Sequence, residues 1–332
     1  MALRKSKHPK RDTRISKKKN KYRIRNWPEY NQSLVNRGSV TFWFSPEVLQ
    51  GWYSKKKTHK RGRPEVYSDG AIRCALVVKA VFRIALRALQ GFVRSLIATL
   101  RLDLITPHYS QFSRRARDLE IPLRRTLQPG ERLNVIFDST GIKVFGEGEW
   151  KVRKHGYSKR RTWRKVHVGM CADTGEIIVG ALTSNDVNDD EAMIHMMGAL
   201  EGMPLGDVLG DGAYDTADCR EAIHDLGGRQ IIPPKKNARL QGKNPLEALR
   251  ARDQAILRIR ELGPEGAAQW KIEVGYHRRS LVETCMFRYK TIVGDHFSAR
   301  LPSTQLTEMK IKFDVLNRMQ DLGRPKSYKV AS

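Results

Sequence analysis

Apolar residues follow a helical period in the first third of the chain and an extended period after Gly130. Ser45 followed by Pro46 is typical of a helix start, because serine can cap exposed N–H groups and proline fits the first helical turn. Ser68 or Asp69 marks a second start. The pattern predicts helices over residues 45–53, 68–84 and 86–100, with shorter helices up to residue 119.

Strand patterns follow Gly130. A short apolar strand is predicted over residues 133–137, ending at Asp138, and a hairpin over 165–172 and 176–183 turns at Gly175. Later segments alternate: a helix at 190–200, a strand at 208–210 ending at Asp211, a helix at 216–226 and a strand at 230–232. Three consecutive strands followed by alternating units predict a mixed sheet flanked by helices, which is an α/β fold.

Charge is the strongest feature of the composition. The 332 residues have a formal net charge of +27, and so large an excess of Lys and Arg favours polyanions, since binding releases condensed counterions. Nucleic acid is therefore the expected partner. The sequence contains no run of about 18 apolar residues and no apolar signal segment, so we expect a soluble, intracellular protein that does not contact a membrane.

The length allows two domains of about 100 to 200 residues each. Residues 1–25 hold twelve Lys or Arg against one acid, Asp12. We expect residues 1–40 to form a largely flexible basic arm, which contacts DNA or serves as a solubilising tail. An all-α DNA-binding domain is expected over residues 41–128, and an α/β domain over residues 129–332 with a short helical insertion near 236–270.

The last predicted helix of the all-α region holds Arg114 and Arg115 among hydroxyl and amide side chains. Such a mixture is typical of the recognition helix of a helix-turn-helix-like unit. A solvated helix face in a supporting domain would explain the same residues equally well.

Basic and aromatic residues alternate over residues 150–165, where eight Lys or Arg surround Trp150, Tyr157 and Trp163. Aromatic rings can stack on unpaired bases while the cations neutralise phosphates. The alternative is a hairpin whose aromatic side chains cover an edge of the core. We expect DNA contacts from Lys154, Lys159, Arg160, Arg161, Trp163, Arg164 and Lys165.

The cysteines and histidines give no indication of a zinc site. Four cysteines lie far apart and lack the spacing of zinc ligands, and the nine histidines are scattered. We expect the cysteines, Cys74, Cys171, Cys219 and Cys285, to be buried thiols.

Two aspartates interrupt apolar strand segments. Asp138 follows Asn134 to Phe137, and Asp211 follows Leu209 and Gly210. Burying a carboxylate without compensation is costly, so each needs a cation, hydrogen-bond donors or solvent. Asp215 is expected to be the N-cap of the helix that begins near Thr216.

A third carboxylate belongs to the pattern Y-x2-R-x3-E-x6-K, formed by Tyr276, Arg279, Glu283 and Lys290. In one continuous α-helix, at about 100° per residue, all four side chains project to the same side. A solvated amphipathic helix would show the same spacing. An apolar stripe runs beside these residues and consists of Val282, Cys285, Met286, Tyr289 and Val293.

With these motifs the sequence resembles the DDE transposases of bacterial insertion sequences, specifically the insertion-sequence-five family of the insertion-sequence-four-like group. The resemblance covers about residues 26 to 320. Asp138, Asp211 and Glu283 match the three catalytic acids of that family, and the Y-x2-R-x3-E-x6-K pattern is complete. The resemblance implies a ribonuclease-H-like catalytic domain.

The chemistry implied by this resemblance is phosphodiester cleavage and transfer, in which two divalent ions stabilise the entering and leaving oxygens. Carboxylate oxygens suit Mg²⁺, for which Mn²⁺ would substitute. We expect Asp138 to bridge the ions while Asp211 and Glu283 hold one each. Arg279 and Lys290 are expected to bind flanking phosphates, and Tyr276 the backbone or a displaced base.

The expected function is that of a transposase, a metal-dependent enzyme that binds terminal inverted repeats in double-stranded DNA, cleaves at them and joins the ends to target DNA. Pairing of two ends suggests a homodimer or a larger homo-oligomer in the bacterial cytoplasm, associated with the nucleoid when bound to DNA. The alternatives are a DNA-binding protein of transposase descent that no longer cuts, and a ribonuclease-H-like nuclease or resolvase without strand transfer.

Overall fold

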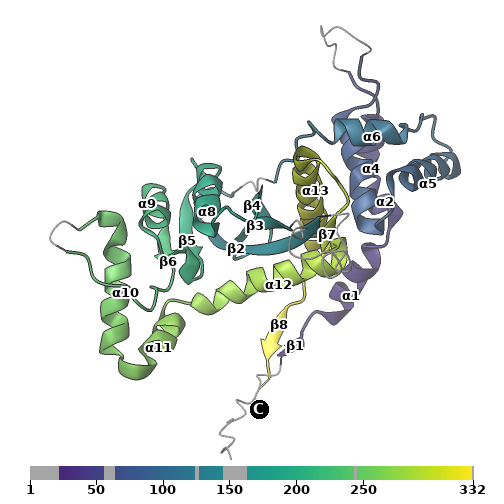
Figure 1. Cartoon of the computed structure of the whole chain (residues 1–332). Helices are drawn as coiled ribbons and strands as arrows, with labels where there is room; N and C mark the ends of the chain where they lie inside the picture. Colours follow the sequence, from purple (N-terminus) through teal and green to yellow (C-terminus); the bar gives the residue numbers. More distant parts are fainter. Residues whose placement is uncertain (1–21, 56–63, 124–126, 145–162, 243–244, 331–332) are drawn as a thin grey trace, which may run out of the picture.

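The computed structural model describes the chain except for residues 1–21, 56–63, 124–126, 145–162, 243–244 and 331–332. Figure 1 shows a central sheet, with the helices of the first third of the chain at one end of the molecule and helices α9 to α11 at the other. In the described part of the chain, no helix is both long and apolar enough to cross a membrane. The four cysteines are buried, as expected.

The first third of the chain is helical from Trp27. Ser68 caps helix α4 by accepting a hydrogen bond from the Ala71 N–H. Ser45 precedes the shorter helix α3, which has Pro46 at its first position. Both predicted starts are confirmed in position, but capping by a side chain is confirmed only for Ser68, because the Ser45 side chain accepts no hydrogen bond from the first turn of its helix. The helices are α1 (Trp27–Asn36), α2 (Val40–Trp43), α3 (Pro46–Gln50), α4 (Asp69–Phe82), α5 (Leu86–Thr99) and α6 (Tyr109–Arg115).

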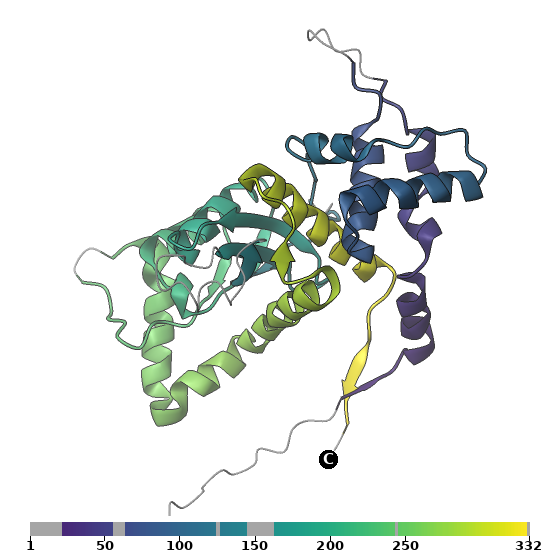
Figure 2. The ribbon, with the colours of Figure 1, turned by 45° about the vertical axis from the view of Figure 1, so that its right-hand side comes forward.

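The expectation of a largely flexible arm over residues 1–40 is wrong for its described part. Strand β1 (Tyr22–Ile24) pairs antiparallel with β8 (Ser327–Lys329) near the other end of the chain, as Figure 2 shows, and α1 follows. The Asn26 side chain adds hydrogen bonds to Arg324 O and Lys326 N. The C-terminal partner strand, which local composition does not reveal, supplies the backbone hydrogen bonds. Residues 1–21 lie outside the described part.

A mixed sheet of β2 to β7 forms the centre of the molecule. Its strand order is β4-β3-β2-β5-β6, and short β7 also pairs with β2. β2, β3 and β4 are antiparallel neighbours, whereas β5 and β6 run parallel to β2. The strands are β2 (Leu133–Val144), β3 (Trp163–Cys171), β4 (Ile177–Thr183), β5 (Leu205–Leu209), β6 (Arg229–Ile231) and β7 (His296–Phe297).

Strand β2 does not end at Asp138, as the apolar pattern predicted. It continues to Val144, and the pairing with β3 runs without a break from Val135 opposite Cys171 to Lys143 opposite Trp163. The prediction failed because a polar residue can stay in a strand when a neighbouring strand pairs with its backbone. Asp138 therefore lies within a strand, opposite Val168.

Helices cover both faces of the sheet. Val135 and Phe137 point toward α8 (Asp189–Gly198) and α9 (Ala217–Asp225), whereas Ile136 and Ile142 face α12 (Ser280–Arg288) and α13 (Pro302–Asp321). The alternation follows from the two-residue period of a strand. Mixed sheet and flanking helices thus agree with the expected fold class.

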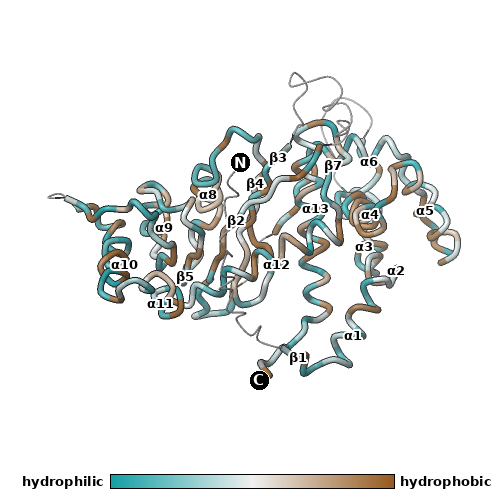
Figure 3. Tube along the Cα trace, turned by 60° about the horizontal axis from the view of Figure 1, so that its bottom comes forward, coloured by the Kyte–Doolittle hydropathy of each residue, from teal (hydrophilic) through white to brown (hydrophobic). Residues whose placement is uncertain are grey.

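The helices of the first third share their hydrophobic core with the α12 and α13 face of the sheet. One continuous cluster of buried side chains joins residues of α2 to α6 to residues of α12 and α13. Figure 3 shows α4, which is hydrophobic along much of its length, beside α13. Arg73 of α4 adds a bidentate ion pair with Asp314 of α13, at 2.7 and 3.2 Å. The division into domains at residues 41–128 and 129–332 remains a prediction.

The segment that holds the Y-x2-R-x3-E-x6-K pattern is not one continuous α-helix. It follows α10 (Arg250–Glu261) and α11 (Gly266–Glu273), begins as a 3₁₀ turn (Tyr276–Arg279), continues as α12 and ends as a π-helical turn (Tyr289–Val293). Because 3₁₀ and π turns have different numbers of residues per turn, the predicted uniform angular spacing does not hold. The predicted apolar stripe is nevertheless buried.

Asp215 is not the N-cap of α9. Thr216 is the cap, and its hydroxyl accepts from Cys219 N. The Asp215 side chain is buried and forms ion pairs with Arg220 at 2.8 Å and with Arg252 at 3.2 Å. Its second oxygen accepts from Lys235 N at 2.7 Å. The sequence has two adjacent residues that can cap this helix, and the ion pairs with Arg220 of α9 and Arg252 of α10 hold Asp215 inward.

Candidate active site

The register of two parallel strands places Asp138 and Asp211 next to each other. Ile136 of β2 pairs with Leu209 of β5, and each aspartate comes two residues later on its own chain. Ile136 and Leu209 belong to the core on the α12 side, so the same period directs both carboxylates to that side. Between Leu209 and Asp211 stands Gly210, where an added Cβ would lie 2.8 Å from the Tyr214 ring.

Glu283 approaches the two aspartates from α12, which packs against β2 through its buried stripe. The Arg279 guanidinium joins all three acids. Its Nη2 lies 3.6 Å from Asp138 Oδ1 and 3.5 Å from Asp211 Oδ2, and its Nη1 donates to Glu283 Oε1 at 2.5 Å. The structure therefore brings the three predicted acids together around the Arg279 guanidinium.

Exposure differs among the four side chains. Asp138 and Arg279 are 16% and 18% exposed, whereas Asp211 and Glu283 are 40% and 58% exposed. The Asp138 carboxylate accepts a hydrogen bond from the Ser139 N–H at 3.0 Å, and the Asp211 carboxylate accepts one from the Ala213 N–H at 2.8 Å. Asp211 and Glu283 are thus open to solvent, whereas Asp138 is mostly buried.

Burial raises the pKa of Asp138 above its ordinary value, and the charges of Asp211 and Glu283 act in the same direction, against Arg279 and the Ser139 N–H. Burial opposes the charge of Arg279, but Asp138, Tyr276 and Asp211 raise the pKa of its guanidinium overall. Tyr276 also has a raised pKa, mainly through burial. Ionising Asp138 is therefore less favourable in the folded chain than in water.

Asp138→Asn is expected to increase the free energy of unfolding of the metal-free protein at pH 7. An acid whose pKa is raised on folding stabilises the fold only below its unfolded pKa, here the ordinary 3.8, and this contribution is lost as pH rises through the folded pKa. Wild type should thus lose stability relative to the asparagine variant above that window. Urea unfolding in chelator at pH 7 and pH 3.5 measures the difference.

The gain should be large at pH 7 compared with pH 3.5, where the aspartate is mostly protonated in both folded and unfolded chains. Asp103→Asn, at an exposed position remote from the carboxylates, is the matched control and should change neither value. An asparagine variant less stable than wild type at pH 7 would show that the pairing with Arg279 outweighs burial.

The donor set of this site suits a hard divalent cation, because it consists of carboxylate oxygens open to solvent on one side. As the side chains lie, no group of three His, Cys, Asp or Glu in the described residues encloses an ion. The three carboxylates instead share the Arg279 guanidinium, whose Nε has no hydrogen-bond partner in the described part of the chain. The chemistry of these oxygens suits a metal ion, and in this arrangement the guanidinium occupies the place between them.

The other two members of the pattern lie at either end of α12. Tyr276 is half-buried, and the Lys271 ammonium lies 5.2 Å from its ring centroid. Lys290 is exposed within the π-helical turn, without a partner among the described residues. Lys290 is thus free to bind an anion, while Arg279 is engaged.

Strand β3 holds the described end of the basic and aromatic segment. Lys165 contacts Asp189 at 3.2 Å and Val187 O at 2.8 Å, on the α8 side of the sheet and away from the carboxylates. Arg164 donates to Gln305 of α13 at 3.3 Å, and the Lys143 ammonium lies 6.0 Å from the Trp163 ring centroid. Lys154, Lys159, Arg160 and Arg161 lie outside the described residues.

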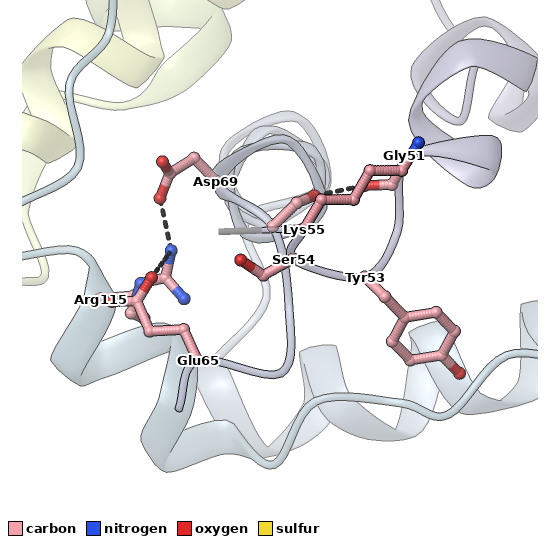
Figure 4. Close-up of a pocket in the computed structure, with 8 residues that line it drawn as sticks. Gly51, Tyr53, Ser54, Lys55, Glu65, Asp69 and Arg115 are labelled. Carbon is pink, nitrogen blue, oxygen red and sulfur yellow. Dashed lines mark hydrogen bonds and ion pairs between the residues drawn. The ribbon is translucent and has the colours of Figure 1, made fainter. Parts of the chain in front are cut away.

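Arg114 and Arg115 lie at the end of α6 and differ in their surroundings. Arg114 is exposed. Arg115 points toward Asp69 at the start of α4 (Figure 4), also contacts Glu65 at 3.2 Å, and donates to Tyr67 O at 2.9 Å. These contacts tie α6 to α4, so Arg115 has a structural role in this arrangement.

Sequence reasoning missed a groove of about 780 Å³ where α4, α5 and α6 meet β7 and α13. Its floor is apolar and includes Leu76, Phe112 and Ile311, and Glu308 is the only carboxylate among its described lining residues. The only indication of this groove in the sequence was a basic residue at every fourth position from 79 to 87. Because α4 ends at Phe82 and α5 begins at Leu86, these residues do not form one face of a single helix. The cations that line the groove are Lys79, Arg83, Arg87, Arg117, Arg300 and Lys312.

Two family models, both described as transposase DDE domain, match residues 35–147 and 129–317, and the second covers more than half of the chain. An uncharacterized protein of Aquifex aeolicus (strain VF5) is 28% identical over 211 residues, which are 60% of this chain and 65% of the relative. The chain thus spans slightly less than two thirds of that relative's length.

Solved structures with similarity to this chain include a piggyBac transposase synaptic complex with hairpin DNA, at a TM-score of 0.40 and 13% identity, covering 86% of this chain and 73% of that chain. A Drosophila P element transposase strand transfer complex has a TM-score of 0.31 and 9% identity, and the alignment covers 83% of this chain and 85% of that chain.

Proposed function

The chain belongs to the transposase DDE domain family, and from this premise we propose that it is a DNA transposase that cleaves DNA at the terminal inverted repeats of an insertion sequence and joins the ends to target DNA. The observation that supports this best is the convergence of Asp138, Asp211 and Glu283 on one guanidinium. The strand order and the complete Y-x2-R-x3-E-x6-K pattern support a ribonuclease-H-like domain of the insertion-sequence-five type.

DDE transposases use divalent metal ions. Asp138, Asp211 and Glu283 would hold them here, and Mg²⁺, or Mn²⁺ in its place, suits their oxygens. When bound, such ions stabilise the entering and leaving oxygens of an in-line displacement at phosphorus. Because Asp211 and Glu283 are exposed to solvent, a phosphodiester can approach the three acids from that side.

The cations around the acids would position the DNA backbone. Lys290 is exposed and without a partner among described residues, and we assign it to a phosphate beside the scissile bond. The half-buried ring of Tyr276 lies next to Arg279, where it can contact a sugar or a base. Lys290 and Tyr276 would contact parts of the DNA that do not change during the reaction. Their main contribution would therefore be to orient the scissile phosphate relative to the acids.

The groove of α4 to α6, β7 and α13 is the surface that we assign to duplex DNA outside the active site. Six cations line it against one carboxylate, and that carboxylate, Glu308, is already paired with Lys312 at 3.2 Å. Arg117 and Arg300 are exposed and have no partner within the described residues. A phosphate backbone is the occupant whose charge this surface complements.

Arg117→Glu combined with Arg300→Glu is expected to weaken duplex binding by about 10- to 100-fold at moderate salt, with a shallower dependence on salt because fewer counterions are released. Fluorescence anisotropy across a salt series measures both quantities. Arg260→Glu, an exposed position on α10 at the opposite end of the molecule, is the control. If the control variant had an effect of similar size per charge, net charge and not the groove would explain the loss.

Supercoiled plasmid containing an element end tests the whole proposal. Wild type should nick or cut it when Mg²⁺ is added, and fragments that contain the end should join to a second plasmid. Cutting without joining would indicate a nuclease or a resolvase. DNA binding without any cutting would indicate a binding protein of transposase descent.

Two further features follow from pairing two element ends in one reaction. We expect the chain to act as a homodimer or a larger homo-oligomer on DNA. We place the reaction in the bacterial cytoplasm, at the nucleoid, because that is where the substrate of a bacterial insertion sequence lies.

A further inference from the structure

Arg279 occupies the place toward which the three acids converge. One guanidinium serves all of them, with Nη2 3.6 and 3.5 Å from Asp138 and Asp211, and Nη1 2.5 Å from Glu283. Its Nε is buried and has no hydrogen-bond partner among the described residues. Within the described part of the chain, hydrogen bonds and ion pairs hold this side chain only through the three acids.

The neighbouring Arg278 shows a contrasting arrangement. It pairs with Asp173, in the turn between β3 and β4, and lies 3.8 Å from Asp207 of β5. These contacts anchor the 3₁₀ turn to the sheet independently of the acids. The Arg279 side chain can therefore leave the carboxylates while the backbone that supports it stays in place.

A divalent cation and the Arg279 guanidinium would compete for the same oxygens. Three carboxylates gathered in a partly buried site repel one another and need a counter-charge. In this arrangement the arginine provides it. An ion bound by the same oxygens would remove that need and would also repel a guanidinium left in place. Metal binding therefore requires Arg279 to move, and a nearby phosphate would favour the move by providing a new partner.

We propose that Arg279 is an exchangeable counter-ion, which neutralises Asp138, Asp211 and Glu283 in the free protein and transfers to a phosphate of bound DNA when a divalent cation takes the acids. This inference rests on the proposed function, because it assumes that the three acids hold metal and that the chain binds DNA. DNA then removes a competitor of the metal. By linkage, the metal strengthens DNA binding by the same factor.

Mn²⁺ binding to the full chain without DNA tests the exchange, by titration calorimetry or by electron paramagnetic resonance of the free ion. Arg279→Gln is expected to bind Mn²⁺ on the order of tenfold more tightly than wild type, within the usual range for coupled sites. Arg278→Gln is the matched control and should retain the wild-type affinity, since its partners lie outside the acid group. Circular dichroism verifies the fold of each variant.

A short duplex of arbitrary sequence provides the second part of the test. DNA should increase the Mn²⁺ affinity of wild type and leave that of Arg279→Gln almost unchanged, because the competitor is already gone. Arg279→Lys retains the charge without the fork that reaches three acids, so its affinity should lie between the two. Unchanged or weaker Mn²⁺ binding by Arg279→Gln, or an equal effect of DNA on it, would overturn the exchange.

Failure of the proposed function would look different. If folded wild type and Arg279→Gln both bind no Mn²⁺, with or without DNA, the acids are not a metal site and the function proposed above is wrong as well. If Mn²⁺ binds to wild type and is lost in Asp138→Asn, but Arg279→Gln gains nothing, the metal site stands and only the exchange is refuted.

Discussion

On the function proposed above, alanine in place of Asp138, Asp211 or Glu283 is expected to lower metal-dependent DNA cleavage on the order of a thousandfold or more, because each carboxylate would contribute to the charge that holds the ions at the reacting phosphate. The three side chains converge within reach of one guanidinium, so none can substitute for another from its position. Cleavage of supercoiled plasmid under single-turnover conditions measures the loss.

DNA binding by the same variants should remain close to that of wild type or increase slightly, since each substitution removes a negative charge. The cations that line the groove are unchanged in these variants. Asp225→Ala, an exposed aspartate at the end of α9, is the control and should cleave normally. A variant of one of the three acids that cleaves at the wild-type rate would exclude that residue from the site.

Asp215→Ala is expected to lower the free energy of unfolding by about 3 to 5 kcal/mol, because it leaves a buried guanidinium without its counter-charge. Asp215 and Arg220 have side chains that are 1% exposed. The aspartate also accepts from Lys235 N, so the change also removes a contact between the segment that follows Asp211 and the segment that follows β6. Urea unfolding at pH 7 measures the effect.

Thr216→Ala provides the internal comparison, since loss of a helix cap costs about 1 kcal/mol. The order of the two effects distinguishes the buried ion pair from the capping role that sequence predicted for Asp215. Adding Arg220→Met to Asp215→Ala should recover part of the loss, because the buried charge is removed with its partner. Equal effects of Asp215→Ala and Thr216→Ala would contradict the buried-pair explanation.

Local composition was enough to identify the parts of the candidate site. An aspartate after an apolar strand segment is conspicuous because burial of a carboxylate is costly, and both Asp138 and Asp211 were found in this way. The apolar stripe beside Glu283 indicated which side of that helix packs inward. Capping chemistry located the start of α4 at Ser68 for the same reason: it depends on neighbouring residues only.

Features that depend on distant partners were not predictable. The continuation of β2 beyond Asp138 depends on pairing with β3. The formation of strand β1 by residues 22–24 depends on pairing with β8, about 300 positions away in the chain. The inward turn of Asp215 depends on Arg252 of α10. The groove combines cations of α4 to α6 with Arg300 and Lys312, which no local pattern connects.

By itself, the sequence determined which chemical groups are present and, in regular strands and α-helices, on which side they lie, because side-chain period is there a local property of the backbone. Only the tertiary structure decided what those groups meet. It set Asp138 and Asp211 in register across two parallel strands, and it placed the Arg279 guanidinium between them and Glu283. Charge interactions depend on distance in space, so spacing along the chain could list the acids and the arginine together but could not show that they pair.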